Sequence, residues 1–439
     1  MATTLPADSL SARPAPAGAS FAARDPSPLG DAREQARLGL YVHVPFCAVR
    51  CAYCDFATGS LSAAKVARYF EGLTLEMARR ADSARGVAFT SVFFGGGTPS
   101  ALSSRHFERL WSLLRDHFTL APDAEITLEA NPESVRPALL DAWAAAGVNR
   151  LSMGAQSFDA QELERLGRIH DRDRPAEAVA LARRHGFRRL SLDLMFGFPG
   201  HGLPTFDETL ERTLGLDLEH VSAYCFIPEP DTPMGRSVLS GELALPSPEE
   251  QADLYQRLGA RLGAEGYQPY EISNFSRPGG EARHNLVYWL RRDYLGIGPS
   301  AHGLWRGVRY GNHPALERWA ACLAAGRAHD AVEAETPESC TEEIVMLGLR
   351  LSEGLRRRDY SAAVWNEVTH HYEGAFDAAC ATRRLVRTHD GWRIPAEHGF
   401  VGDDVTAWIL AVAESRGFDS SRNRSVPSPP CPSQHSSAV

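Results

Sequence analysis

Apolar, β-branched segments alternate with helix-like segments, and this alternation limits the fold of the 439-residue chain more than any other feature. The strand-like segments are Leu38–Val44, Thr90–Phe94, Glu125–Glu129, Arg150–Met153, Leu190–Phe196 and His220–Phe226. The helix-like segments between them are Ala63–Arg80, Arg105–Phe118, Pro137–Ala146, Arg174–His185 and Thr205–Leu214. Repeated strand–helix units predict an α/β fold with a parallel sheet and right-handed crossovers. Because six such units are fewer than the eight of a closed barrel, we expect a partial, TIM-like (β/α)6 barrel.

Polar and glycine-rich residues interrupt this pattern where the predicted strands end. They are the cysteine loop after the first strand, then Gly95–Pro99, Glu129–Pro132, Gly154–Gln156, Asp193 with Gly197–Gly200, and Tyr224. The carboxyl ends of parallel strands meet at one edge of a sheet, where α/β proteins place their ligands. The sequence therefore predicts one shared site at this edge.

Three cysteines, Cys47, Cys51 and Cys54, follow the first predicted strand with the spacing C-x3-C-x2-C. Thiolates in one loop can hold an iron–sulfur cluster, and three of them leave one iron open to another molecule. A zinc site completed by His43 is an alternative, since three cysteines and a histidine form a common tetrahedral set. That histidine belongs to a strand and precedes Pro45, which makes it awkward to fold back onto the same metal.

Other side chains at the predicted strand ends suit a polar ligand. Glycines such as Gly95–Gly97 let backbone N–H groups approach a charged molecule closely, although a tight turn needs them equally. Glu129, Gln156 and Asp193 can bind ribose hydroxyls or an amino group. Each alone could equally cap a helix or be a satisfied polar group of the core, so their common location is the stronger argument.

Composition and the chain ends narrow the class of protein. The formal net charge of −9 argues against a general nucleic-acid-binding surface, and the scattered remaining cysteines fit a reducing cytoplasm. We expect a disordered leader at 1–37, a barrel with its extension at 38–330, a mostly helical, winged-helix-like domain at 331–415 and a disordered tail at 416–439. The short strand-like patch Gly391–Pro395 suggests the winged helix, which we expect to cover the barrel mouth or a ligand there.

The cysteine spacing, with Tyr53 before the last cysteine, resembles the radical S-adenosylmethionine superfamily. Longer segments resemble the oxygen-independent coproporphyrinogen oxidase family within it: Tyr41–Cys47, Phe94–Ser100, Glu129–Glu133, Ser152–Phe158, Asp193–Gly200 and Gly296–Gly303. The resemblance covers residues 38 to 410. It implies a [4Fe-4S] cluster on the three cysteines, with S-adenosylmethionine on the open iron and a 5′-deoxyadenosyl radical as the reactive product.

The resemblance also assigns ligand contacts, residue by residue. It implies that Tyr41, Gly96 and Glu129 contact this S-adenosylmethionine, with Tyr53 near the adenine. It implies that a second molecule of S-adenosylmethionine is held by Gly97, Thr98, Gln156, Arg168 and Asp193. No catalytic residue is assigned.

Two departures from the oxidases, Phe56 and the leader expected to be disordered where the oxidases have an ordered segment near the substrate, and a third feature, the segment His284–Trp289, point to the related heme chaperones of the HemW branch. The oxidases carry a further cysteine two residues after the third cluster ligand, where this chain has Phe56. The segment His284–Trp289 matches the His-Asn-x-x-Tyr-Trp signature of the chaperones. A neutral histidine can ligate heme iron, so His284 is the candidate heme ligand, although an ordinary interfacial histidine is the alternative.

The resemblance thus implies a heme chaperone that binds heme and delivers it to apoproteins, some of them at the membrane. Its other expected partner is a reductant such as a flavodoxin or ferredoxin, and no nucleic acid is expected. The alternative is an oxidase of porphyrin biosynthesis that converts coproporphyrinogen III to protoporphyrinogen IX by oxidative decarboxylation.

Overall fold

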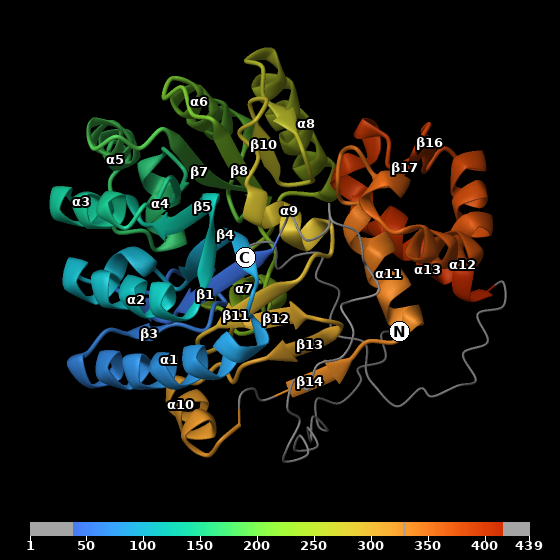
Figure 1. Ribbon diagram of the computed structural model, residues 1–439. Coiled ribbons are helices and arrows are strands. Elements are labelled where there is room, and N and C mark those ends of the chain that lie inside the picture. Colours follow the sequence, from blue (N-terminus) through green and yellow to red (C-terminus); the bar gives the residue numbers. More distant parts are fainter. Residues whose placement is uncertain (1–37, 328–330, 416–439) are drawn as a thin grey trace.

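The computed structural model describes residues 38–327 and 331–415, and Figure 1 shows a large α/β unit beside a smaller helical one. The leader expected at 1–37 and the tail expected at 416–439 lie outside the described residues. Within the described ranges, no helix combines the length and the apolar character needed to cross a membrane.

Parallel strands form the centre of the large unit and confirm the predicted partial barrel. They lie side by side in chain order: β1 (Gly39–Val44), β4 (Ala88–Gly96), β5 (Thr119–Ala130), β6 (Arg150–Gln156), β7 (Arg189–Phe196) and β8 (His220–Cys225). Each observed strand overlaps the predicted one. All carboxyl ends consequently lie at one edge of the sheet, as a functional site there requires.

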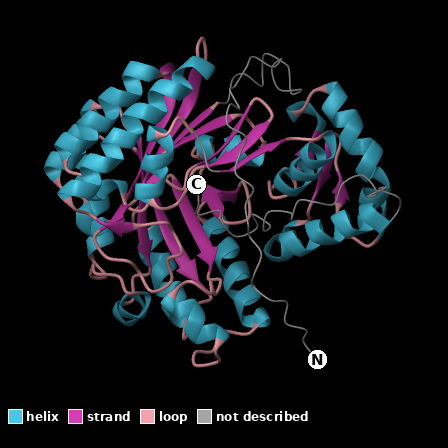
Figure 2. Cartoon of the chain, turned by 90° about the horizontal axis from the view of Figure 1, so that it is seen from below, coloured by secondary structure: helices cyan, strands magenta, loops and turns pink. Residues whose placement is uncertain are grey.

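Helices between the strands cover the outer face of the sheet, as Figure 2 shows. They are α1 (Ala63–Ser83), α2 (Ser104–His117), α3 (Pro137–Ala145), α4 (Ala160–Leu166), α5 (Arg174–Arg184) and α6 (Leu203–Leu214). Side chains such as Ser62 and Ser103 start helices by accepting backbone hydrogen bonds from the first turn. Because strand residues alternate between faces, Leu40 and Val42 pack under the helices while Tyr41 and His43 lie inside the barrel.

Short strands extend this sheet at both edges. Beyond β8 lie β10 (Asn274–Ser276) and β9 (Gln268–Pro269), and beyond β1 lie β11 (Tyr294–Ile297), β12 (His302–Trp305), β13 (Val308–Gly311) and β14 (Ala331–Ala334). A two-stranded sheet, β2 (Phe46–Cys47) with β3 (Gly59–Ser60), brackets the cysteine loop. The helices of this region are α7 (Pro233–Leu239), α8 (Pro248–Ala264), α9 (Arg283–Trp289) and α10 (Leu316–Ala324).

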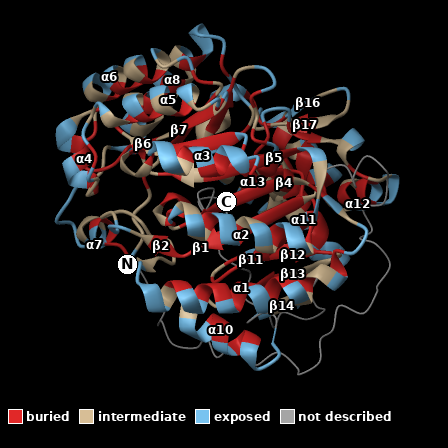
Figure 3. Cartoon of the chain, turned by 60° about the vertical axis from the view of Figure 1, so that its left-hand side comes forward, coloured by how far each residue is buried: buried red, intermediate tan, exposed pale blue. Residues whose placement is uncertain are grey.

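The smaller unit has a hydrophobic core of its own, which includes Trp365, Phe376 and Trp392. Its elements are α11 (Pro337–Gly348), α12 (Ala362–Ala381), α13 (Gly402–Ser415) and a three-stranded sheet of β15 (Leu355–Arg356), β17 (Gly391–Arg393) and β16 (Val386–Arg387). The mostly helical character expected here is confirmed. Figure 3 shows the buried residues concentrated in the sheet and on the inner faces of the helices.

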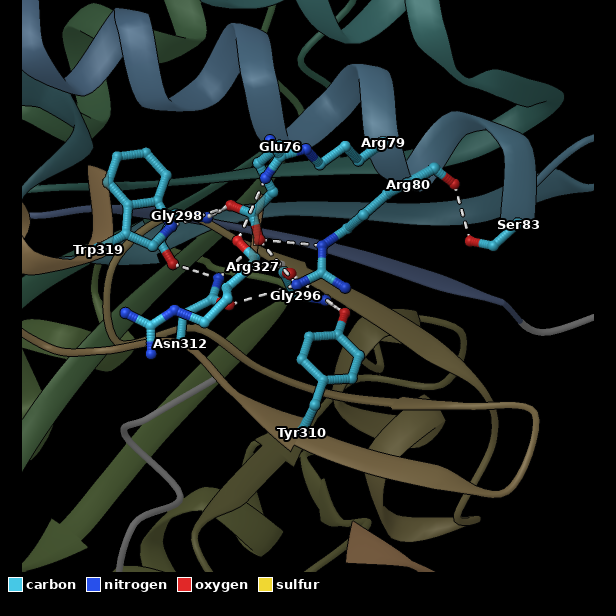
Figure 4. Close-up of polar contacts among 10 residues, drawn as sticks. All are labelled: Glu76, Arg79, Arg80, Ser83, Gly296, Gly298, Tyr310, Asn312, Trp319 and Arg327. Carbon is cyan, nitrogen blue, oxygen red and sulfur yellow. Dashed lines mark hydrogen bonds and ion pairs between the residues drawn. The ribbon is translucent and has the colours of Figure 1, made fainter. Parts of the chain in front are cut away.

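A buried ion pair joins α1 to the edge of the sheet (Figure 4). Arg80 donates to Glu76 Oε1 from Nε at 2.9 Å and from Nη2 at 2.7 Å, and their side chains are 1% and 0% exposed. The same carboxylate accepts hydrogen bonds from the Gly298 N–H at 2.8 Å, Asn312 Nδ2 at 2.8 Å and Trp319 Nε1 at 3.2 Å. We call Glu76, Arg80, Gly298, Asn312 and Trp319 the Glu76 cluster.

The Glu76 cluster also fixes the loop after β11 against β1. Gly298 has a φ of +100°, and a Cβ there would lie 2.6 Å from the carbonyl oxygen of His43. Only glycine allows this approach at that φ. The loop therefore supports β1 immediately before the cysteines.

Candidate functional site

A cavity of about 390 Å³ opens at the carboxyl ends of the parallel strands. Every site residue expected from the sequence lines it, with the exception of Tyr41 and His284: Cys47, Cys51, Tyr53, Cys54, Gly96, Gly97, Thr98, Glu129, Gln156, Arg168 and Asp193. The prediction that strand ends gather into one site thus agrees with the fold, whereas the ligand contacts assigned to single residues stay predictions.

The three cysteines lie on one loop at the rim of this cavity. Cys47 Sγ lies 3.1 Å from Thr98 Oγ1, and Arg168 Nη1 donates to Cys51 Sγ at 3.5 Å. Burial raises the pKa of the Cys54 thiol to about 12, so loss of its proton at neutral pH needs a bound metal. Three thiols beside an open cavity fit a [4Fe-4S] cluster that keeps one iron available to a ligand.

His43 does not face the cysteines as a zinc ligand would. Its Nδ1 lies 3.1 Å from the Tyr41 hydroxyl, and its Nε2 lies 3.3 Å from the carbonyl oxygen of Ala57. Burial lowers the pKa of His43 to about 4, which keeps the ring neutral. No set of three or more His, Cys, Asp or Glu side chains in residues 38–327 and 331–415 is arranged around a single ion. The zinc alternative therefore lacks its fourth ligand here.

The glycine run after β4 brings backbone close to a buried carboxyl group. The Gly96 N–H donates to Glu129 Oε2 at 3.2 Å. Gly96 has a φ of +104°, and a Cβ there would lie 2.4 Å from the His43 ring. Burial, with the nearby Asp193 charge, raises the pKa of Glu129 well above its usual range. A bound cationic amino group would therefore favour ionisation of Glu129.

Arg168 connects the cysteine loop to the ends of β5 and β6. It donates through Nη2 to the Gly154 carbonyl oxygen at 2.7 Å and to Asn131 Oδ1 at 3.1 Å. Asp193 accepts a hydrogen bond from Ser152 at 2.9 Å, and burial raises its pKa. These contacts hold the guanidinium and the carboxyl group on one wall of the cavity, where the resemblance assigns a second S-adenosylmethionine.

His284 lies in α9 with no exposed surface, outside the lining of the cavity. Its Nδ1 is 2.8 Å from Ser91 Oγ and its Nε2 is 2.8 Å from the Tyr288 hydroxyl, and the ring stacks on Phe93. Its neighbour Asn285 does line the cavity. Both ring nitrogens thus have partners in this structure, so heme ligation there requires α9 or the ring to move.

Several lining residues were missed by the sequence analysis. Arg150 and Ser222 come from inside the barrel, while Arg350, Phe400 and Asp403 come from the helical unit. Arg350 donates to Asp403 Oδ1 at 3.1 Å and has Glu271 at 3.6 Å. The helical unit therefore forms part of the cavity wall, which agrees with the expectation that it covers the barrel mouth.

A parallel partial barrel with a three-cysteine loop after its first strand defines a radical S-adenosylmethionine protein. In agreement, residues 41–213 match the family model described as the Radical SAM superfamily. A solved structure similar over 88% of this chain and 94% of its own, with a TM-score of 0.75 and 25% identity, is the Escherichia coli coproporphyrinogen III oxidase HemN, described as a radical SAM enzyme.

Sequence relatives identify the family within this class. The protein named heme chaperone HemW in Mycobacterium tuberculosis is 39% identical over 321 residues, which cover 72% of this chain and 82% of that protein. The Bacillus subtilis protein of the same name is 35% identical over 323 residues, covering 73% and 85%. This chain belongs to the HemW family of radical SAM proteins.

Proposed function

We propose that this protein is a heme chaperone, which binds heme together with a [4Fe-4S] cluster and S-adenosylmethionine and passes heme to apoproteins. The observation that carries the proposal is the extent of similarity to proteins named heme chaperone HemW, up to 39% identity over 82% of the relative. A reductant such as a flavodoxin or ferredoxin, apoproteins at the membrane, a cytoplasmic location and the domain limits given above remain predictions.

Phe56 separates this proposal from the oxidase alternative. The aromatic ring lines the cavity two residues after Cys54, where the resemblance places a cysteine in the oxidases. A phenyl ring offers neither a thiolate nor an acidic proton. The chain therefore keeps the cluster ligands and lacks one thiol that the decarboxylating relatives have.

Different residues of the cavity would hold the cluster and S-adenosylmethionine. When bound, the cluster and S-adenosylmethionine supply one-electron chemistry. Cys47, Cys51 and Cys54 would hold the cluster. Glu129, which accepts a hydrogen bond from the Gly96 N–H, would accept hydrogen bonds from the amino group of the ligand and so orient it. Arg168 would donate a hydrogen bond to Cys51 Sγ, at 3.5 Å, and so position the cysteine loop against the cavity wall.

His284 is the proposed heme ligand, and its ring must break a hydrogen bond of the present structure before it can ligate iron. The ring must leave Ser91 or Tyr288 before a nitrogen can reach iron. Each hydrogen bond is worth about 1 kcal/mol. Tyr288→Phe removes one of them and should raise heme affinity if His284 is the ligand, whereas His284→Ala should lower it.

Hemin titration of the cluster-loaded protein tests both points through the Soret band. We expect saturable binding that weakens in His284→Ala and strengthens in Tyr288→Phe. If neither variant changes the Soret shift, His284 is not the ligand. Cys51→Ala should remove the cluster absorbance, which checks the cluster site without choosing between functions.

A turnover assay tests the alternative. Coproporphyrinogen III, S-adenosylmethionine and a low-potential reductant are incubated with the cluster-loaded protein, and protoporphyrinogen IX is measured. We expect none. Steady formation of protoporphyrinogen IX would overturn the chaperone proposal and favour the oxidase, to which the similarity with HemN also points.

A further inference from the structure

Arg150 is a buried arginine that faces the cavity without a partner. It begins β6 inside the barrel, its surface is 3% exposed, and it lines the cavity. In the described ranges, 38–327 and 331–415, its guanidinium group makes no hydrogen bond and no ion pair. An isolated charge in a protein interior costs several kcal/mol. A partner from outside the chain would remove this cost.

The groups around Arg150 do not neutralise it. Glu129 and Asp193 are close enough to feel its charge, but neither carboxyl group lies within the 4.0 Å of an ion pair. Burial raises the pKa of both carboxyl groups, which favours their neutral forms. On the other side, burial and then the Arg150 charge lower the pKa of His220 and His284, so both rings are neutral. In the described part of the chain, the positive charge of Arg150 therefore has no carboxylate at ion-pair distance.

Other buried arginines of the molecule are paired. Arg80 lies 2.7 Å from Glu76, Arg291 lies 2.8 Å from Glu343, and Arg350 lies 3.1 Å from Asp403. The half-buried Arg189 lies 2.8 Å from Glu125, whose side chain is completely buried. Arg189 is the register neighbour of Arg150 on β7, so the two side chains share the same end of the barrel. The chain can therefore supply acidic partners at this depth, and Arg150 has none.

A second buried polar group without a hydrogen-bond partner in the described residues lies beside Arg150. Thr127 is its register neighbour on β5. The Thr127 hydroxyl is buried and has no hydrogen-bond partner in the part of the chain that the structure describes. Buried hydroxyls without partners are rare in proteins. Two neighbouring donors on adjacent strands thus lack an acceptor.

We propose that Arg150 binds a carboxylate group of the ligand that occupies this cavity. A guanidinium group matches a carboxylate with two parallel hydrogen bonds. Two ligands carry such a group: a tetrapyrrole through its propionates, which rests on the function proposed above, and S-adenosylmethionine through its α-carboxylate. Arg150 is then a determinant of ligand position rather than a structural charge.

A double-mutant cycle with modified ligands tests the proposal. Hemin and hemin dimethyl ester are titrated into cluster-loaded wild type and Arg150→Gln, with the Soret band as readout. S-adenosylmethionine and its decarboxylated analogue are compared in the same proteins by calorimetry. For one ligand pair, loss of the carboxylate should weaken binding to wild type roughly 10- to 100-fold more than binding to Arg150→Gln.

The pair that shows this coupling identifies the source of the carboxylate. If neither pair does, Arg150 does not bind a carboxylate and the proposal is wrong. Failure of hemin to bind wild type would reject the chaperone function, while the S-adenosylmethionine pair would still test Arg150. If Arg150→Gln does not fold, Arg150→Lys, which keeps the positive charge, takes its place in the titrations. Arg189→Gln is the matched control, since its partner Glu125 is internal, and should leave both couplings unchanged.

Discussion

Arg80 and Arg150 are both almost completely buried, yet their surroundings differ. Arg80 lies in the Glu76 cluster, where the carboxylate accepts two hydrogen bonds from it. Arg150 lines the cavity and has no carboxylate within ion-pair distance. A charge that is neutralised inside the chain holds the fold together, whereas a charge that faces a cavity unpaired is available to a ligand.

The largest expected effect comes from breaking the Glu76 cluster. Glu76→Gln keeps the shape of the side chain but leaves Arg80 as an uncompensated buried charge. We expect a loss of about 3–5 kcal/mol in the free energy of unfolding, measured with urea. Glu76→Met combined with Arg80→Met should lose less than Glu76→Gln alone. Loss below about 1 kcal/mol in the single variant would contradict the structural role given to the cluster.

A buried titratable group can also avoid the free-energy cost of an unpaired charge by staying neutral, as His201 does. Its Nδ1 accepts a hydrogen bond from the Gly197 N–H at 3.1 Å, and burial lowers its pKa from 6.5 to about 4. In the unfolded chain His201 therefore binds a proton below pH 6.5, whereas in the folded chain it binds this proton only below about pH 4. Stability from this group is complete above pH 6.5 and is lost as the pH falls.

His201→Asn keeps an acceptor for Gly197 and removes the titration. Between pH 6 and pH 4.5, the advantage of wild type over this variant should shrink by about 1.4 kcal/mol for each pH unit. Urea unfolding at several pH values measures the difference. Curves that stay parallel over this range would show that the ring is not kept neutral by the fold.

Arg150 should behave in the opposite way to Glu76 in stability measurements. Arg150→Met removes an unpaired charge and replaces it with an apolar side chain of similar length. We expect a change of less than about 1 kcal/mol in the ligand-free protein, or a gain. A loss of 3 kcal/mol or more would mean that Arg150 is bound inside the chain, and the comparison with Arg80 would fail.

The smallest effect is expected at the surface. Arg85 lies 2.7 Å from Asp82, but the two side chains are 83% and 81% exposed. Water screens such a pair, so Asp82→Asn should not change the urea midpoint measurably. A clear shift would show that distance alone, without burial, decides what an ion pair contributes in this protein.

The central architecture could be predicted from the sequence because its signals are local. Long apolar strands and amphipathic helices repeat from Leu38 to Phe226, and each of the predicted strands overlaps an observed one. The added strands β9 to β14 were missed, since segments of two to four residues carry too little periodicity to recognise. The mostly helical character of the smaller unit was expected from a change in the sequence pattern and is confirmed, whereas its winged-helix-like fold stays a prediction.

The site was predictable where motifs mark it and not where tertiary contacts create it. The cysteines and the glycine run stand out in the sequence by spacing alone. Arg150 gives no such signal, because its importance lies in the absence of a partner, which only the packed barrel reveals. The buried ring of His284 is a similar case, since its contacts with Ser91 and Tyr288 join parts of the chain far apart in sequence.

The most direct measurement is to divide one cluster-loaded, S-adenosylmethionine-bound preparation between a hemin titration and a coproporphyrinogen III incubation. The account predicts a saturable Soret change with hemin and no protoporphyrinogen IX. The opposite pattern, product formation without saturable hemin binding, would contradict it and place the protein with the oxidases.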